Sequence, residues 1–431
     1  MLDALKYRNF RLFFFGQGVS LVGTWMQQTT MAWLVYQLSG KLDYMPGLMG
    51  FCGMLPAFFL TPLAGVYTDR WNRHRTILIT QSLAMLQSVV LVVLAATHTL
   101  AVWHLFVLSL FLGIVNAIDM PARQTFLIEL VEERRNLGNA ISLNSSIFNG
   151  AQLVGPAIAG FLIKPMGAWF CFLLNAISFL AVLASLLAMR LPPPLPPKPR
   201  RRVVLELKEG LHYAYHFLPI RAILLLLATI SLTAMSLNAL MPVFAVKVLH
   251  GGPETQGLLT GAIGLGALIG ALLLAVRNTV LGLGRLIALT TGVFGLSLLA
   301  FSWSGALWMS MGILTVGGFA RMIGIAASNT ILQTIVDDDK RGRVMSLYTM
   351  AMLGMAPLGC LIAGGMAHYF GATYAVAIAG VACLMGCLAF TRRLPAMRLV
   401  VRPIYRRIGI LPEASAGIVA VTDWTAPAEE K

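Results

Sequence analysis

One carboxylate in this sequence stands apart because of where it lies. Asp119 is the single Asp or Glu, of 17 in the chain, that falls inside one of the long apolar stretches. Ionisable groups in such surroundings are costly and usually functional, and proton coupling requires a titratable group of this kind. Asp119 is therefore a candidate proton carrier. Arg123 follows one helical turn later, so a static ion pair between the two side chains is the alternative interpretation.

One cation has a comparable position. Arg321 lies well inside another apolar stretch, where a guanidinium group could attract an anionic molecule. A long side chain of this type could instead extend toward the lipid headgroups at the cytoplasmic side. Both interpretations stay open.

Neutral polar residues also recur at mid-depth in the apolar stretches. Taken singly, each is more typical of a hydrogen bond between two helices than of a ligand contact. Aromatic and methionine side chains near them would suit a bulky apolar molecule. The candidate cavity residues are Trp25, Gln27, Gln28, Met31, Asn149, Gln152, Asn238 and Arg321.

Two charged clusters follow apolar stretches. In the segment GVYTDRWNRHR, residues 65–75, a glycine lets helix ends approach closely, and one aspartate stands among several arginines. Such a cluster can hold two halves of a molecule together and release them again. The simpler alternative is a basic loop with an incidental aspartate. The predicted gating residues are Gly65, Asp69, Arg70, Arg73, Arg123, Asp337, Arg341 and Arg343.

The segment GPAIAG, residues 155–160, carries Gly155, Pro156 and Gly160. Pro156 removes one helical hydrogen bond, and the small residues permit close helix packing. A kink at a packing site is the simplest interpretation.

The sequence predicts no cofactor, no metal and no enzyme. It contains no Gly-x-x-x-x-Gly-Lys-Ser/Thr phosphate loop and no His/Cys cluster with the spacing of metal ligands. An enzyme within the membrane would need a buried catalytic pair, and no two polar residues are spaced to suggest one.

The composition identifies the elements that must position these residues. Of the 431 residues, 58% are hydrophobic and 11% are charged, whereas soluble domains carry about 25% charged residues. Apolar stretches long enough to cross a bilayer as helices recur along the chain. We predict an all-α membrane protein with twelve transmembrane helices, at 10–38, 45–68, 76–97, 102–122, 139–163, 167–190, 220–249, 255–277, 285–303, 305–331, 344–369 and 372–391.

The basic residues predict the orientation of the chain. The net charge is +15, but of 32 Lys and Arg only Lys41, Lys164 and Lys247 fall outside alternate connecting segments. This distribution follows the positive-inside rule and predicts a multi-pass protein with both termini in the cytoplasm. It argues against nucleic acid as a partner and allows contact with anionic membrane lipid.

An internal repeat divides the chain into two six-helix bundles. Residues 138–160 align without gaps on residues 342–364, with matching glycines that include Gly138/Gly342, Gly150/Gly354 and Gly160/Gly364. A Pro- and Arg-rich segment separates the copies. The predicted parts are an N-terminal bundle (1–190), a cytoplasmic linker with a short amphipathic helix (191–218), a C-terminal bundle (219–391) and a cytoplasmic tail (392–431).

These motifs resemble the major facilitator superfamily of transporters. Its loop pattern G-x-x-x-D-R/K-x-G-R/K-R/K is matched by Gly65, Asp69, Arg70 and Arg73, while Asn72 replaces a glycine. GPAIAG is similar to the antiporter motif of that superfamily. Three longer segments, among them SLVGTWMQQTTMAWLVYQLSG, look like the enterobactin-exporter and macrolide-efflux branch.

The resemblance implies a fold and a mechanism. It implies the major facilitator fold in a bacterial inner membrane, a monomer, and proton-driven export of a siderophore or drug-like amphipathic molecule by alternating access. The candidate cavity residues lie on helices that face the centre of such transporters. Two alternatives stay open on the same fold, which are an uptake symporter and a flippase for lysophospholipids or other lipids.

Overall fold

The structure is a computed structural model that describes residues 3–68, 71–131, 133, 136–190, 212–275 and 279–407. Twelve long helices account for most of these residues, each at the place of one predicted span. They are α1 (Arg8–Leu38), α2 (Met45–Thr68), α3 (Arg73–Ala96), α4 (Val102–Glu129), α5 (Leu137–Met166), α6 (Ala168–Leu187), α8 (Leu218–Val243), α9 (Pro253–Ala275), α10 (Leu283–Ser302), α11 (Leu307–Ile335), α12 (Asp338–Phe370) and α13 (Ala372–Arg407).

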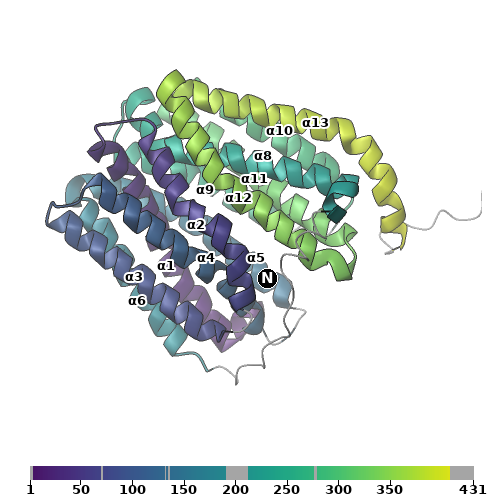
Figure 1. Cartoon of the computed structure of the whole chain (residues 1–431), viewed down its shortest axis with the longest axis horizontal. Helices are drawn as coiled ribbons and strands as arrows, with labels where there is room; N and C mark the ends of the chain where they lie inside the picture. The colour runs from purple at the N-terminus through teal and green to yellow at the C-terminus, as the bar shows by residue number, and fades with distance from the viewer. Residues whose placement is uncertain are drawn as a thin grey trace, which may run out of the picture.

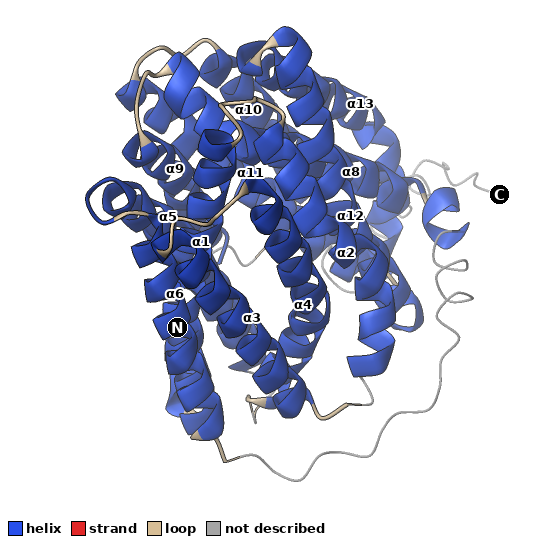
Figure 2. Cartoon of the chain, turned by 60° about the vertical axis from the view of Figure 1, so that its left-hand side comes forward, coloured by secondary structure: helices blue, strands red, loops and turns tan. Residues whose placement is uncertain are grey.

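Short elements complete the described chain. A 3-10 helix, η1 (Asp3–Lys6), precedes α1, and a π-helical turn, η3 (Phe244–Val248), continues α8. The described residues contain no strand, as Figure 2 shows. Among them, ten helices are long and apolar enough to cross a membrane. The all-α membrane architecture is therefore confirmed.

The helices form two bundles that lie side by side. Figure 1 shows α1–α6 on one side of the molecule and α8–α13 on the other, with α2, α5, α9 and α12 between them. Buried residues of α8–α13 form one large apolar core, and smaller cores lie among α1–α6. Many large apolar side chains face outward, as expected for helices in contact with lipid. We use "predicted inner end" for the end where α1 begins and "predicted outer end" for the end where α1 meets α2.

Two helices extend beyond their predicted ends. α4 was expected to end near Pro121 but continues to Glu129, with the proline inside the helix. α13 was expected to end at residue 391 but continues to Arg407, through two prolines. In both cases the helix continues through proline and charged residues, because proline removes one backbone hydrogen bond without ending the helix. Most of the predicted linker, 191–211, and the last residues, 408–431, lie outside the described residues, whereas 212–216 form one helical turn.

Candidate transport pathway and its gates

Close helix contacts join the two bundles toward the predicted outer end. A Cβ atom added to Gly47 of α2 would lie 2.8 Å from Cα of Gly364 in α12. One added to Gly160 of α5 would lie 2.7 Å from the carbonyl oxygen of Pro253, where α9 begins. Such distances leave no room for a side chain, so the helix backbones touch. Glycines on both bundles therefore build the outer contact.

Polar contacts reinforce the same end. Lys247 of η3 donates to the Asp43 carboxylate with Nζ and Oδ2 2.6 Å apart, which links the α1–α2 loop to the C-terminal bundle. Gln256 of α9 donates to the carbonyl oxygen of Thr29 in α1 at 3.2 Å. The Lys247 side chain is half exposed, so its ion pair stands at the rim of the contact.

The antiporter-like segment lies within these contacts. A Cβ atom at Gly155 would come within 2.8 Å of Cβ of Trp25, so α5 packs closely on α1 there. Gly160, further along α5, touches α9 as described above. Pro156 lies inside the helix between them. The segment thus sets the packing of α5 against both bundles, as its small residues indicate.

Asp119 is buried and fully engaged within the N-terminal bundle. Its side chain is 4% exposed. Thr80 and Gln81 of α3 donate to its Oδ1 atom at 2.6 and 2.9 Å, and Arg123 donates to Oδ2 from one turn further along α4. Among the described residues it is the only buried carboxylate. The ion pair with Arg123 is therefore present, and it holds α4 against α3.

The predicted inner gate is described in part. Asp69 and Arg70 lie outside the described residues, and Gly65 belongs to the last turns of α2. Arg73 begins α3 and forms an ion pair with Glu129 at the end of α4. Asn72, which replaces the family glycine, caps α3 by accepting a hydrogen bond from the Arg75 backbone at 3.1 Å. The departure from the family pattern thus supplies a helix cap.

The second predicted cluster lies at the start of α12. Asp337 is the N-cap residue of this helix, and Lys340 approaches its carboxylate at 3.8 Å. Lys340 also lies 4.8 Å from the ring centre of Tyr213, just before α8. Arg341 and Arg343 occupy the first turns of the same helix. These contacts link the inner end of α12 to the start of the C-terminal bundle.

Arg321 and Asn238 line one small cavity inside the C-terminal bundle. Its other lining residues come from α8, α9, α10 and α11 and include Ser297 and Phe294, but no carboxylate. No ion pair or hydrogen bond of the Arg321 side chain is recorded among the described residues. Arg321 lies midway between Leu307 and Ile335, and half of α11 spans roughly 21 Å at about 1.5 Å per residue. That distance exceeds the reach of an arginine side chain, so the guanidinium group cannot reach either end of α11.

The remaining cavity candidates do not line this small cavity. Gln27 is 1% exposed and faces its own bundle, where it donates to Gln87 and accepts from Ser88 and Asn175 at 2.7 to 2.9 Å. Met31 is buried in an apolar core of the N-terminal bundle. Gln28 is exposed, and Trp25 packs edge-to-face on Phe148. Asn149 donates to the carbonyl oxygen of Ser145. Gln152 is buried where α5 meets α9.

Sequence reasoning missed the residues that close the outer end. Asp43 and Lys247 are far apart in the chain, and each is an ordinary loop or helix-end charge on its own. Gly47 and Gly364 belong to a chain with 41 glycines, so their type alone is uninformative. Their role depends on which helices of the two bundles face each other, which the spacing of one helix does not reveal.

Known proteins agree with this architecture. The chain is 27% identical to the staphyloferrin A transporter of Staphylococcus aureus over 88% of this chain and 95% of that protein, and 26% identical to the multidrug efflux pump Tap of Mycolicibacterium fortuitum over 90% and 95%. It is 27% identical to the enterobactin exporter of Salmonella paratyphi A over 70% and 72%.

Solved structures share the fold at low sequence identity. A POT family transporter in complex with 5-aminolevulinic acid has a TM-score of 0.72 at 13% identity, covering 90% of this chain and 96% of that one. A bacterial homologue of the human lysosomal transporter Spinster has a TM-score of 0.61 at 15% identity, covering 95% and 99%. The two-bundle arrangement is thus the fold of these solved transporters.

A family model decides the assignment. The model described as "Transmembrane secretion effector" matches residues 2–402, which is nearly the whole chain. All the relatives named above are transporters of one superfamily. The chain belongs to the transmembrane secretion effector family of the major facilitator superfamily.

Proposed function

We propose that this protein exports an amphipathic small molecule, a siderophore or drug-like compound, by proton-coupled alternating access. The observation that carries the proposal is the nearly full-length similarity to a siderophore transporter and a multidrug efflux pump. The two bundles in contact through glycines supply the surfaces that must separate and close in such a cycle.

In this cycle the contacts at the predicted outer end form the outer gate. Gly47, Gly160 and Gly364 with the Asp43–Lys247 ion pair would hold that end closed while the substrate enters from the cytoplasm. The clusters around Asp69 and Asp337 would hold the opposite end when the outer gate opens. Each half-cycle then exchanges one set of contacts for the other.

The substrate site is proposed around Arg321 and Asn238. A guanidinium group midway along a spanning helix, in a cavity whose lining contains no carboxylate, favours a ligand with an anionic group. Asn238 can donate and accept hydrogen bonds beside it. Trp25, Asn149 and Gln152 lie on the N-terminal bundle and would meet the substrate from the other side. Gln27 and Met31 are left out of this set because their side chains pack within the N-terminal bundle.

Asp119 is proposed as the proton-coupling residue. Protonation would neutralise its carboxylate, break the ion pair with Arg123 and turn one acceptor into a donor, so the α3–α4 contact would change. The coupling then acts through a helix contact close to the inner gate, since Arg73 and Glu129 join the ends of the same two helices.

Proton movement in proteoliposomes tests the proposal. Siderophores and amphipathic drugs are added to the reconstituted protein under an imposed pH gradient. Export coupled to protons predicts that one compound releases lumenal protons, and that Asp119→Asn abolishes the release while the compound still binds.

Arg123→Gln breaks the same ion pair but keeps the carboxylate, so it should slow transport without uncoupling it. If both variants stay coupled, Asp119 serves only packing. If no compound moves protons while a labelled lysolipid crosses the bilayer, the export proposal fails.

A further inference from the structure

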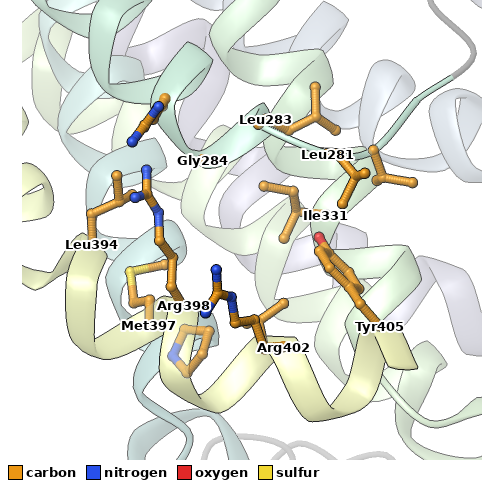
Figure 3. Close-up of a pocket in the computed structure, with 14 residues that line it drawn as sticks. Leu281, Leu283, Gly284, Ile331, Leu394, Met397, Arg398, Arg402 and Tyr405 are labelled. Atoms are coloured by element: carbon orange, nitrogen blue, oxygen red, sulfur yellow. The ribbon is translucent and has the colours of Figure 1, made fainter. Parts of the chain in front are cut away.

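A second basic site lies away from the proposed transport pathway. A cavity of about 300 Å³ opens at the predicted inner end of the C-terminal bundle, between the starts of α8 and α10 and the ends of α11 and α13. Figure 3 shows Arg398 and Arg402 extending from α13 toward the segment that carries Leu281 and Gly284. Arg285, from the first turn of α10, is the third cation on its wall.

These three arginines have no partner among the described residues. No ion pair or hydrogen bond is recorded for Arg285, Arg398 or Arg402, and no carboxylate lines the cavity. All three side chains are exposed. Three positive charges gathered around one cavity repel one another, so an anion bound between them would relieve that repulsion.

The rest of the cavity wall is apolar. Leu283, Leu394 and Met397 are buried beneath the arginines, and Tyr405 is 9% exposed at the far side. The remaining apolar lining residues are Pro219, Val280, Leu281, Ile331 and Val401. A ligand that fits this site therefore combines an anionic group with an apolar body. A free inorganic anion would leave most of the wall uncovered.

The position of the cavity identifies the source of such a ligand. α10 packs on α11 and α13, and Figure 1 shows both α10 and α13 on the side of the molecule away from α1–α6. The cavity is therefore separate from the contact between the two bundles. It lies where four helices end, at the level expected for lipid headgroups, and the basic residues predict that this is the cytoplasmic side.

We propose that this cavity binds an anionic phospholipid of the inner leaflet. Its phosphate group lies among Arg285, Arg398 and Arg402, close to the N terminus of α10, whose helix dipole adds positive potential. Part of an acyl chain covers Leu281 and Met397. Binding joins α13 to α10 at their ends, so it stabilises the cytoplasmic side of the C-terminal bundle.

Native mass spectrometry of the purified full-length protein tests this site. Phosphatidylglycerol and phosphatidylcholine are titrated separately into the detergent-solubilised protein. We expect tighter binding of phosphatidylglycerol, and about a tenfold or greater loss of that affinity in the triple variant Arg285→Gln/Arg398→Gln/Arg402→Gln, since each basic residue near an anionic headgroup strengthens its attraction.

A matched control separates a site from general attraction. Arg392→Gln/Arg393→Gln/Arg406→Gln removes the same charge from exposed positions of α13 that do not line the cavity. It should change the affinity for phosphatidylglycerol by less than about threefold, because unpaired surface charges contribute little each. Equal losses in both triple variants, or no loss in the first, would refute the site. Elution volume and melting temperature establish that both variants are folded.

The ligand class is tested in the same assay. If excess inorganic phosphate displaces phosphatidylglycerol from the wild-type protein, the cavity is a free-anion site and the lipid proposal is wrong. A second variant, Leu281→Gln/Met397→Gln, keeps the three arginines and makes the wall polar. It should weaken the binding of phosphatidylglycerol, and unchanged binding would contradict an acyl chain on that wall.

Discussion

At the scale of single residues, the surroundings of two ionisable side chains distinguish residues that have similar positions in the sequence. Asp119 and Arg321 are both ionisable residues in apolar stretches. Asp119 has three donors around it, whereas the cavity around Arg321 offers Asn238 and no carboxylate. The Asp119 carboxylate is thus fully hydrogen-bonded between α3 and α4. The Arg321 guanidinium group has no acidic residue in the lining of its cavity. Their functions should differ accordingly.

Arg321 should select for anionic substrates. Arg321→Gln removes the positive charge but keeps a hydrogen-bonding group. We expect about a tenfold or greater fall in transport of anionic compounds, because the anionic group of the substrate would then be unpaired inside the membrane, which is costly. Transport of cationic or neutral compounds should fall much less. Arg321→Lys should restore part of the activity toward anions. Equal losses for all charge classes would show that Arg321 serves only the packing of α11.

Gln27 gives a contrasting prediction. Its side chain joins α1 to α3 and α6 through Gln87, Ser88 and Asn175, so Gln27→Leu leaves buried partners unsatisfied. We expect a destabilisation of about 1 kcal/mol, within the range measured for hydrogen bonds between membrane helices, seen as a lower melting temperature in detergent. The apparent affinity for substrate should stay unchanged. A changed affinity with an unchanged melting temperature would return Gln27 to the cavity lining, as its sequence position suggested.

At the scale of helices, the outer gate depends on positions where no side chain fits. Gly364 of α12 meets Tyr44 and Gly47, and its added Cβ would lie 2.9 Å from the Tyr44 carbonyl oxygen. The neighbouring Gly365 would place a Cβ in open space. The same substitution should therefore disturb the contact at Gly364 and leave it unchanged at Gly365.

Gly364→Val should force the outer gate open, and Gly365→Val should not. Cys360 reports on this contact, because it is 3% exposed and lies against Gly47 and Gly50. With Cys52, Cys171, Cys383 and Cys387 replaced by alanine, we expect faster maleimide labelling of Cys360 in Gly364→Val and the wild-type rate in Gly365→Val. Equal labelling in both variants would mean that the α2–α12 contact does not govern access.

The helices themselves could be predicted from the sequence, because each apolar stretch must satisfy its own backbone in a bilayer. The ends of α4 and α13 could not, since Pro121, Pro395 and Pro403 lie inside helices that continue past them. Proline removes one hydrogen bond but does not end a helix that neighbouring helices support. The predicted span 102–122 therefore ends just after Asp119, whereas α4 continues to Glu129.

At the scale of the whole molecule, α5 packs on α9 and α2 packs on α12, so helix packing joins the two bundles and charged groups add little. The Asp43–Lys247 ion pair is the described charge pair that joins one bundle to the other. It is partly exposed, so its contribution to the outer-closed state should be at most about 1 kcal/mol, which corresponds to about a fivefold change in the equilibrium between the two states.

A charge swap tests this latch. Asp43→Lys and Lys247→Asp should each shift the protein toward the outer-open state, as measured by distances between spin labels placed on the 39–44 loop and on α9. The double variant restores an ion pair with reversed signs and should recover the wild-type distances in large part. If the two single shifts simply add in the double variant, the pair does not couple the bundles.

The pairing of the bundles explains why the site was harder to predict than the fold. Gln27 and Asn238 are both amide residues at mid-depth, but whether such a side chain packs within its bundle or lines a cavity depends on helix rotation. Arg321 and Asn238 could be proposed from the sequence because charged and amide groups are rare at that depth, and both line one small cavity. Asp43, Lys247 and the contacting glycines are common residues that only the assembled bundles bring together.

The placement of Arg123 one turn after Asp119 has a consequence for biosynthesis. Since both charges belong to α4, they can pair before any other helix is present, and the segment can leave the translocation machinery as a neutral unit. Each isolated charge at the centre of a helix would raise the cost of membrane insertion by about 3 kcal/mol. Thr80 and Gln81 bind the carboxylate later, when α3 and α4 associate. Arg123 is thus placed to pair with Asp119 before the bundle has formed.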